Sequence, residues 1–255
     1  MFLYQKIGGR SLHFAIEKLH ENSDTIVVFV HGLMGSPLQF SDLVERVYEK
    51  GFSAVALLLP GHGGSGFCFA KAKIKDWEEY LENQLRKYSK YKNIYIVGHS
   101  IGGLLALNAS LEFDLKGIVL LATPLVLNLF NVALLPKRAK LFLGKVDEKI
   151  IKSYKQLNSI GKPYYISMPF WIRVLLQPYT LIKKTKKNLS KVFTPTLVIH
   201  SQSDETATLE SSYLFHELLV NSKHEILILK DSWHAYYTDY EKEIIAAKVD
   251  AFISD

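Results

Sequence analysis

Short runs of apolar residues, rich in Val, Ile and Leu, recur along the chain and alternate with longer stretches of helical periodicity. A continuous apolar run is typical of a strand that is buried on both faces, as in a parallel sheet covered by helices on both sides. The pattern therefore predicts an α/β fold with a mostly parallel central sheet. The strands are predicted at Thr25–Val30, Ser53–Leu59, Asn93–Val97, Gly117–Ala122, Thr196–His200 and His224–Lys230.

Two more strands are predicted near the start of the chain, at Phe2–Ile7 and Ser11–Glu17, on either side of Gly8-Gly9. A pair of glycines between strand-forming runs is typical of a β-hairpin, so we expect antiparallel strands at the edge of the sheet. Further along the chain, the segment that begins at Asp76 resembles a capping box, and we expect Asp76 to cap the start of a helix.

The alternation of strands and helices stops after the fourth apolar run and resumes about 70 residues later, at Thr196–His200. We interpret residues 123–193 as a helical cap inserted into a core that is formed by residues 1–122 and 194–255. The cap is expected to lie over the carboxyl edge of the sheet, where open α/β sheets bind ligands. Its charge indicates a surface role of its own, because 14 Lys and Arg against two acidic residues give it a net charge of +12, whereas the whole chain carries +6.

The composition sets broad limits on the class of protein. The chain has 255 residues, of which 48% are hydrophobic and 22% charged, as in an ordinary globular domain. The single cysteine, Cys68, excludes an internal disulfide and favours a reducing compartment. The first ten residues contain Lys6 and Arg10 and no apolar stretch of signal length, so we expect a cytoplasmic protein.

Residues Gly98–Gly102 read GHSIG and match the pattern G-x-S-x-G. They follow the predicted strand Asn93–Val97 and precede the helix-forming segment Leu104–Leu111, which is the context of a nucleophile elbow. In such a turn the glycines allow the backbone to bend sharply, so that the hydroxyl of Ser100 stands above the end of the sheet. The pattern predicts that Ser100 is a catalytic nucleophile.

A serine hydroxyl is a weak nucleophile unless a base accepts its proton, so a histidine oriented by a carboxylate is expected downstream. His234 follows the last predicted strand, and Asp204 follows the strand before it, which places both at the carboxyl edge of the sheet. We predict that His234 is the base and that Asp204 is the acid. Glu205, the next residue in the chain, is the rival for the acid.

The negative charge that develops on the substrate oxygen needs hydrogen-bond donors that are already in place. The glycine-containing loop His31–Gly35 follows the first predicted core strand, and we assign the donors to the backbone N–H groups of Leu33 and Ile101. A second Gly-rich segment, Pro60–Gly66, lacks the tail of a phosphate loop and is expected to shape the rim of the site. No metal-ligand spacing such as H-E-x-x-H occurs, so we expect neither a metal nor a cofactor.

In these motifs the chain resembles the α/β-hydrolase family, and more narrowly the small bacterial carboxylesterases and monoacylglycerol lipases. The segments that carry the resemblance are HGLMGSP, PGHG, GHSIGG, GIVLLATP, TPTLVIHSQSDE and SWH, and they extend over nearly the whole chain outside the insertion. The resemblance implies an α/β-hydrolase fold with an inserted helical cap. It also implies a hydrolase that transfers an acyl group to water, with Ser100, Asp204 and His234 as catalytic residues and with Leu33 and Ile101 in the oxyanion hole.

We therefore expect a serine hydrolase that cleaves small-molecule acyl esters of monoacyl type and has no nucleic-acid partner. Three alternatives stay open: a thioesterase or a carbon–carbon bond hydrolase on the same triad, and a ligand receptor that keeps the fold without catalysis. The sequence makes no prediction of the oligomeric state.

The predicted cap also suggests a hypothesis about its surroundings. The segment Lys183–Lys187 holds four lysines near the apolar run Met168–Leu176. A cationic surface beside aromatic and aliphatic side chains is typical of a peripheral contact with an anionic membrane. The alternative is a solvated basic face without a partner.

Overall fold

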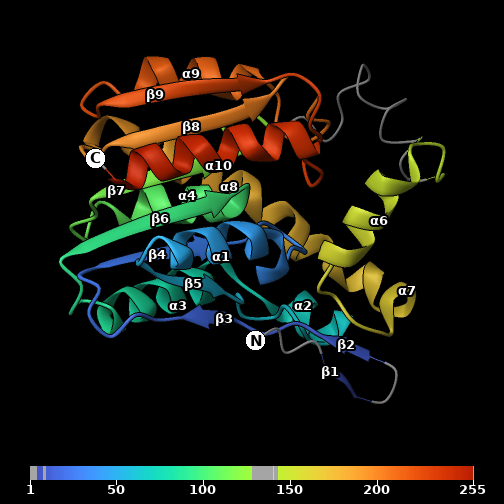
Figure 1. Cartoon of the computed structure of the whole chain (residues 1–255). Helices are drawn as coiled ribbons and strands as arrows, with labels where there is room; N and C mark the ends of the chain where they lie inside the picture. Colours follow the sequence, from blue (N-terminus) through green and yellow to red (C-terminus); the bar gives the residue numbers. More distant parts are fainter. Residues whose placement is uncertain (1–4, 8–9, 128–139, 141–142, 255) are drawn as a thin grey trace.

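The computed structural model describes residues 5–7, 10–127, 140 and 143–254 and shows a central sheet between two layers of helices (Figure 1). Seven strands form this sheet in the order β3-β5-β4-β6-β7-β8-β9, and its neighbouring strands are parallel except for β3 and β5. The strands are β3 (Ile16–Lys18), β4 (Thr25–Val30), β5 (Ser53–Leu57), β6 (Asn93–His99), β7 (Gly117–Leu121), β8 (Thr196–Ser201) and β9 (His224–Leu229). The predicted fold class is confirmed, and a strand forms at each of the apolar runs.

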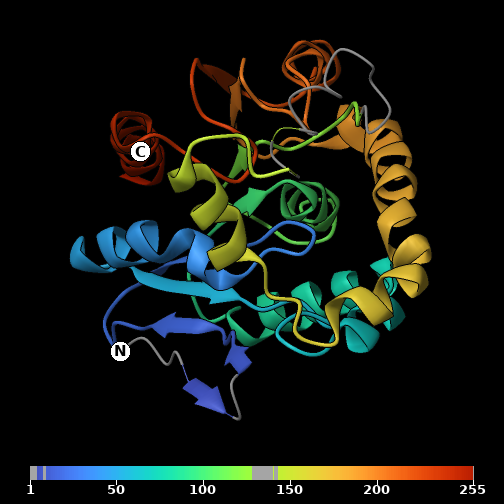
Figure 2. The same ribbon diagram turned by 90° about the vertical axis from the view of Figure 1, so that its right-hand side faces the viewer.

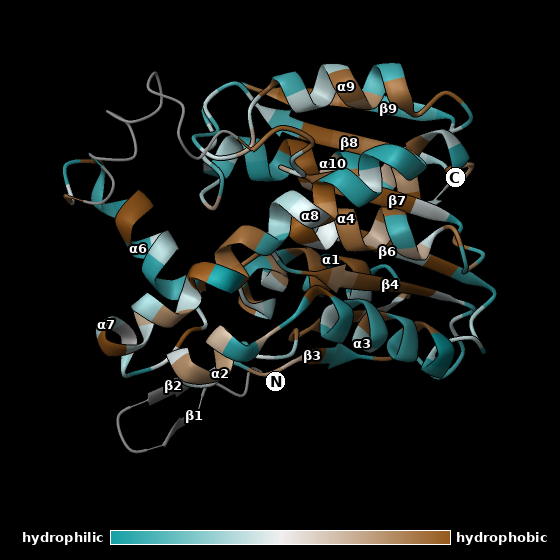
Figure 3. Ribbon diagram, turned by 180° about the vertical axis from the view of Figure 1, so that it is seen from behind, coloured by the Kyte–Doolittle hydropathy of each residue, from teal (hydrophilic) through white to brown (hydrophobic). Residues whose placement is uncertain are grey.

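Alternate residues of each central strand belong to two different cores. In β4, Ile26, Val28 and Val30 pack with α3, α4 and α9 on one face of the sheet. Val27 and Phe29 pack with α1 and α10 on the other face. Because both faces are covered, the strand has no polar alternation, and the strands appear apolar between helices with more polar outer surfaces (Figure 3). These helices are α1 (Ser41–Glu49), α3 (Ile74–Lys87), α4 (Ile101–Ala109), α9 (Glu210–Leu218) and α10 (Asp239–Ser254).

The N-terminal strands differ from the prediction. Strands β1 (Gln5–Ile7) and β2 (Arg10–Leu12) pair with each other in a separate two-stranded sheet, whereas β3 is the antiparallel edge strand of the main sheet. The predicted strand Ser11–Glu17 is therefore divided in two. The break falls at His13, whose side chain is buried and whose carbonyl lies against Gly63, so that the chain leaves the hairpin to pack on the turn after β5. The predicted turn residues Gly8-Gly9 lie outside the described residues.

The prediction that Asp76 caps a helix is wrong in its position. Helix α3 begins at Ile74, and Asp76 lies inside its first turn, where its carboxylate accepts a hydrogen bond from the N–H of Lys73 at 3.1 Å. A carboxylate in the first turn satisfies a free N–H and interacts favourably with the helix dipole, so the residue stabilises the helix start from the third position.

Between β7 and β8, the described part of the insertion is helical. It contains α6 (Glu148–Leu157), α7 (Tyr164–Ser167), η3 (Met168–Trp171), α8 (Ile172–Asn188) and η4 (Leu189–Lys191). Figure 2 looks toward the carboxyl ends of the parallel strands, with α6 (yellow) in front of them and α8 (gold) along the side, where it packs against α4. Residues 128–139 and 141–142 of the predicted cap lie outside the described residues. Among the described helices, none is both long and apolar enough to cross a bilayer.

Candidate active site

Ser100 occupies a sharp turn between β6 and α4. Its backbone has φ +53° and ψ −119°, a left-handed conformation that a non-glycine residue adopts only under strain. The N–H of Ser100 donates to the carbonyl of Leu121 at 2.9 Å, which ties the turn to the end of the neighbouring strand β7. The residue predicted as the nucleophile is thus placed at the carboxyl edge of the sheet.

Three glycines around Ser100 allow α4 to begin close to the sheet. A Cβ atom at Gly102 would lie 2.1 Å from the carbonyl oxygen of Val30, and one at Gly103 would lie 2.0 Å from Oγ1 of Thr123. A Cβ atom at Gly98 would meet the backbone of Gly103 at 2.4 Å. Any side chain at these positions would push the helix away from the strands and move the serine.

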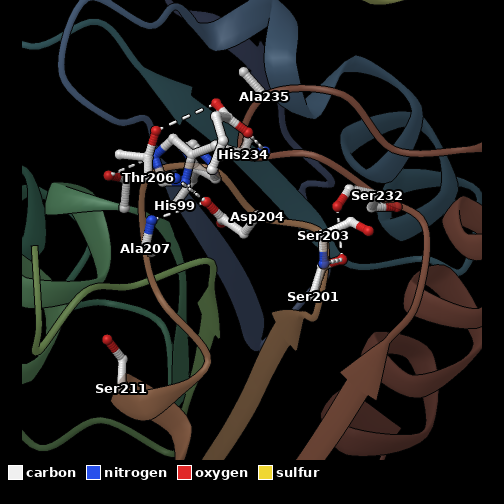
Figure 4. A network of polar contacts seen from close by, with 12 residues as sticks. His99, Ser201, Ser203, Asp204, Thr206, Ala207, Ser211, Ser232, His234 and Ala235 are labelled. Carbon is white, nitrogen blue, oxygen red and sulfur yellow. Dashed lines mark hydrogen bonds and ion pairs between the residues drawn. The ribbon is translucent and has the colours of Figure 1, made fainter. Parts of the chain in front are cut away.

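The structure brings Ser100, His234 and Asp204 together in one line of hydrogen bonds. Nε2 of His234 lies 3.1 Å from Oγ of Ser100, and Nδ1 of His234 lies 2.9 Å from Oδ2 of Asp204 (Figure 4 shows the histidine beside Asp204). An ionised carboxylate only accepts hydrogen bonds, so the contact fixes the proton on Nδ1 and leaves the lone pair of Nε2 facing the serine. This is the tautomer that can accept the serine proton.

Asp204 stays ionised although it is buried. Burial alone would raise the pKa of Asp204, but the charge and hydrogen bond of His234 and the backbone N–H groups of Thr206 and Ala207 together lower it. These two N–H groups donate to Oδ1 at 2.7 and 2.8 Å, which leaves Oδ2 for the histidine. The carboxylate is therefore held in one orientation and carries the charge that stabilises a protonated imidazole.

Glu205, the rival acid, holds the histidine differently. Its Oε2 accepts a hydrogen bond from the backbone N–H of His234 at 3.1 Å, and its Oε1 accepts one from the hydroxyl of Tyr154 on α6. Of the two carboxylates, Asp204 is the one that contacts the imidazole ring. Sequence reasoning missed Tyr154, because no local pattern distinguishes it from the other tyrosines of the chain.

The loop that follows β4 lies directly against the serine. A Cβ atom at Gly32 would be 3.0 Å from Cβ of Ser100, and the N–H of Gly35 closes a tight turn on the carbonyl of Gly32 at 3.0 Å. Leu33 is at the tip of this turn, and its N–H donates to no acceptor within the described residues. Ile101 is the first residue of α4, so its N–H has no acceptor inside the helix. The two residues assigned from the sequence thus directly follow Gly32, which lies against Ser100, and Ser100 itself.

Two buried histidines support this loop. Nε2 of His31 accepts a hydrogen bond from the N–H of Leu59 at 3.1 Å, while its Nδ1 lies 2.8 Å from the carbonyl of Gly32. His62, in the turn after β5, accepts a hydrogen bond at Nε2 from the N–H of Met34 at 3.2 Å. Burial lowers the pKa of His62 to about 4 and that of His31 well below its usual value, so both rings are neutral and able to accept. The turn after β5, which the sequence predicts at the rim of the site, therefore contacts the loop that carries Leu33 through His62.

His99, next to Ser100 in the chain, contacts the loop that carries His234. Its Nε2 lies 2.8 Å from the backbone carbonyl of His234, so it donates to that loop. Burial and the neighbouring His234 lower the pKa of His99 to about 3. Glu241 on α10 also holds this loop. Its carboxylate accepts hydrogen bonds from the N–H groups of Lys230 and Asp231 and from the hydroxyl of Ser232.

Within the part of the chain that the structure describes, no three His, Cys, Asp or Glu side chains are grouped so as to hold a metal ion. Asp204, Glu205 and His234 are instead hydrogen-bonded to each other or to the backbone, and His234 lies in the geometry of proton transfer with Ser100.

Comparison with known proteins agrees with this architecture. Residues 21–241 match the family described as serine aminopeptidase, S33 (Hydrolase_4). The chain is similar to a carboxylesterase of Bacillus subtilis (strain 168), with 21% identity over 91% of this chain and 94% of the relative. It is also similar to a thermostable monoacylglycerol lipase of Bacillus sp. (strain H-257), with 26% identity over 88% of each chain.

Among solved structures, one from a study of LipS and LipT, two metagenome-derived lipolytic enzymes, superposes with a TM-score of 0.74. The superposition covers 94% of this chain and 97% of the other at 21% identity, so it shows the shared fold. The family match extends over most of the chain and includes the strands, turns and loops that carry Ser100, Asp204 and His234. The chain therefore belongs to the serine aminopeptidase, S33 (Hydrolase_4) family of α/β-hydrolases and is a hydrolase of their esterase and lipase group.

Proposed function

We propose that the protein cleaves carboxylic esters of monoacyl type through an acyl-Ser100 intermediate, with Asp204 and His234 completing the triad. The observation that carries the proposal is the line of contacts from Ser100 through His234 to Asp204, at 3.1 and 2.9 Å. The carboxylesterase and monoacylglycerol lipase among the relatives support the choice of an ester as substrate.

The geometry supports a two-step reaction. Oγ of Ser100 attacks the carbonyl carbon of the ester while Nε2 of His234 takes the hydroxyl proton, and the charge of Asp204 stabilises the imidazolium that forms. The oxyanion accepts hydrogen bonds from the N–H groups of Leu33 and Ile101. His234 then gives its proton to the oxygen of the leaving alcohol, which leaves the acyl group on Ser100.

Water completes the cycle. His234 takes a proton from a water molecule, the hydroxide attacks the acyl carbonyl, and the proton returns to Oγ of Ser100 as the carboxylic acid leaves. Leu33 and Leu127, which follow β4 and β7, pack against the apolar core, and the backbone of Leu127 bridges to that of Ala207, whose N–H contacts Asp204.

A series of substrates tests the proposal and separates its alternatives. The purified chain is assayed on nitrophenyl esters and monoacylglycerols of increasing chain length and on acyl-CoA thioesters. We expect the highest kcat/KM on oxygen esters. A higher kcat/KM on the thioesters would replace the esterase by a thioesterase, and binding without turnover of any substrate would indicate a receptor.

A contact between the insertion and an anionic membrane is part of the same proposal. Four large apolar residues on α7, η3 and the start of α8 are each at least 60% exposed, namely Tyr165, Ile166, Phe170 and Ile172. Lys162 and Arg173 are exposed beside them in the chain. Lys183, by contrast, lies about 16 Å further along α8 at 1.5 Å per residue, and Lys184 pairs with Glu78 at 2.7 Å. The exposed apolar residues, together with Lys162 and Arg173, therefore fit an interfacial membrane contact better than the segment Lys183–Lys187 does.

Sedimentation with phosphatidylglycerol vesicles at low and high salt tests this contact. We expect binding at low salt that is weakened by Phe170→Ser with Ile172→Ser, and weakened less when the lysines of Lys183–Lys187 become glutamine. If the unmodified protein does not sediment with the vesicles at low salt, the membrane contact is wrong and the insertion has a solvated basic face.

A further inference from the structure

Helix α6 of the insertion is hydrogen-bonded to the loop that carries the catalytic base. Oγ of Ser153 donates to the carbonyl of Ala235 at 2.8 Å, and the hydroxyl of Tyr154 accepts from the N–H of Ala235 at 3.3 Å. The same hydroxyl donates to Oε1 of Glu205. Two neighbouring residues of α6 thus hold both backbone groups of the residue after His234.

Glu205 connects this helix to the histidine itself. Its side chain is buried with only 2% of the residue exposed, and besides Tyr154 it accepts hydrogen bonds from the backbone N–H of His234 at 3.1 Å and the hydroxyl of Thr206 at 3.2 Å. A buried carboxylate is costly unless its oxygens are hydrogen-bonded, and these donors satisfy both oxygens of Glu205. Burial and the charge of Glu205 raise the pKa of Tyr154, which therefore remains an O–H donor.

The chain that leaves α6 also reaches the opposite side of the site. The N–H of Ser159, two residues after the helix, donates to the carbonyl of Met34 at 3.0 Å in the loop that carries Leu33. The segment from Ser153 to Ser159 therefore spans the site from the base to the oxyanion loop. An insertion that served only as a cover would need no hydrogen bonds to both loops.

We propose that Tyr154 and Glu205 are positioning residues that fix the backbone of His234. Helix α6, which carries Tyr154, therefore contributes to the alignment of the active site and does not only cover it. The inference rests on the proposed function, since it concerns the alignment of His234 with Ser100. In this arrangement Glu205 holds the backbone of His234, while Asp204 orients the ring of His234. Because Tyr154 on α6 is hydrogen-bonded to Glu205, the position of the His234 backbone depends on the insertion.

The rate at which a fluorophosphonate probe labels Ser100 tests the proposal, because labelling needs an aligned base but no natural substrate. Tyr154→Phe removes one hydroxyl and keeps the ring, and we expect labelling about tenfold slower, since small misplacements of a catalytic group have large effects on rate. Glu205→Gln should slow labelling by a similar factor. Because both residues act through one contact, the double variant should be little slower than the slower single variant.

Tyr213→Phe is the matched control, because Tyr213 lies on α9 and is 62% exposed. It should label at the rate of the unmodified protein. Labelling of Tyr154→Phe and of Glu205→Gln at this same rate would overturn the positioning role. If the unmodified protein is not labelled at all, the activated serine of the proposed function is wrong instead.

An NMR signal of His234 tests the positioning role without depending on activity. It therefore distinguishes a failure of that role from a failure of the proposed function. The Nδ1 proton of His234, shared with Asp204, is expected to give a downfield resonance in the unmodified protein and in Tyr213→Phe. In Tyr154→Phe we expect it to shift or broaden while the thermal unfolding remains cooperative. An unchanged resonance would contradict the proposal. If Tyr154→Phe does not fold, the same comparison is made with Glu205→Gln.

Discussion

Asp204 and Glu205 are neighbours in the chain, and they hold different parts of one histidine. Oδ2 of Asp204 lies 2.9 Å from Nδ1 of the His234 ring, whereas Oε2 of Glu205 lies 3.1 Å from the His234 backbone nitrogen. The two carboxylates therefore differ in function although both are buried at the end of β8. Substitutions that keep their shape should separate the two functions.

We predict that Asp204→Asn lowers kcat by about 10⁴-fold, because an amide can stabilise neither the required tautomer nor the imidazolium. Glu205→Gln should cost much less, about tenfold, because it disturbs the backbone of His234 but leaves Asp204 on the imidazole ring. Steady-state kinetics on a nitrophenyl ester check both values. If Glu205→Gln is the more damaging of the two, the acid has been assigned to the wrong residue.

The close approach of α4 to β4 predicts a large stability effect at Gly102. A Cβ atom there would lie 2.1 Å from the carbonyl oxygen of Val30, so Gly102→Ala should lower the free energy of unfolding by more than about 3 kcal/mol. Gly51→Ala is the control, because no atom lies within 4 Å of a Cβ at that position. Gly51→Ala should lower the free energy of unfolding by only about 1–2 kcal/mol, because alanine is strained at φ +89°. Urea unfolding measures both, and equal losses would contradict the close packing.

The buried histidines predict a loss of stability in mild acid. Burial lowers the pKa of His62 and His200 to about 4, that of His99 to about 3, and that of His31 well below its usual value. In the unfolded chain each has a pKa of about 6.5, so below that pH the unfolded state binds protons that the folded state does not. The free energy of unfolding should therefore fall as the pH is lowered from about 6.5 toward 4, by up to about 1.4 kcal/mol per pH unit for each histidine.

Two variants check the origin of this pH dependence. His62→Gln removes a buried histidine and should make the stability less dependent on pH between 7 and 5. His216→Gln removes an exposed one on α9 and should leave the dependence as it is. A free energy of unfolding that stays flat over this range in the unmodified protein would contradict the assignment of neutral, buried rings.

Much of this architecture could be predicted because it is encoded locally. The apolar run of β4 gives the strand with its observed bounds, and GHSIG between a strand and a helix gives the turn at Ser100. The sequence predicts that His234 and Asp204 lie together because residues that follow parallel strands meet at one edge of the sheet. The sequence also favours Asp204 over its neighbour Glu205, and the geometry agrees, since Asp204 contacts the ring of His234 and Glu205 contacts its backbone N–H.

The rest depends on contacts between distant segments. Tyr154 and Glu205 are 51 residues apart, and nothing near Tyr154 marks it among the 14 tyrosines of the chain. The division of Ser11–Glu17 into β2 and β3 follows from the packing of His13 on Gly63, which local propensity does not contain. The sequence predicts a helical cap, but the packing of α8 against α4 is set by the buried face of α8 and not by any motif.

The proposed serine mechanism predicts that chelators leave activity unchanged. Esterase activity is measured after dialysis against excess EDTA and again after addition of zinc. We expect the same kcat/KM in both samples and in the untreated enzyme, because a serine activated by a histidine needs no metal. Activity that is lost on dialysis and restored by zinc would show that the reaction depends on a metal ion.

The acyl-Ser100 intermediate is tested most directly by intact-protein mass spectrometry after rapid acid quench during turnover of nitrophenyl butyrate. We predict a mass increase of one butyryl group, located by peptide mapping to the peptide that contains Ser100. In Ser100→Ala the adduct should be absent and kcat should fall by about 10⁴-fold or more, since the triad residues act as a unit. Near-normal turnover in Ser100→Ala, or a butyryl group on another residue, would contradict the account.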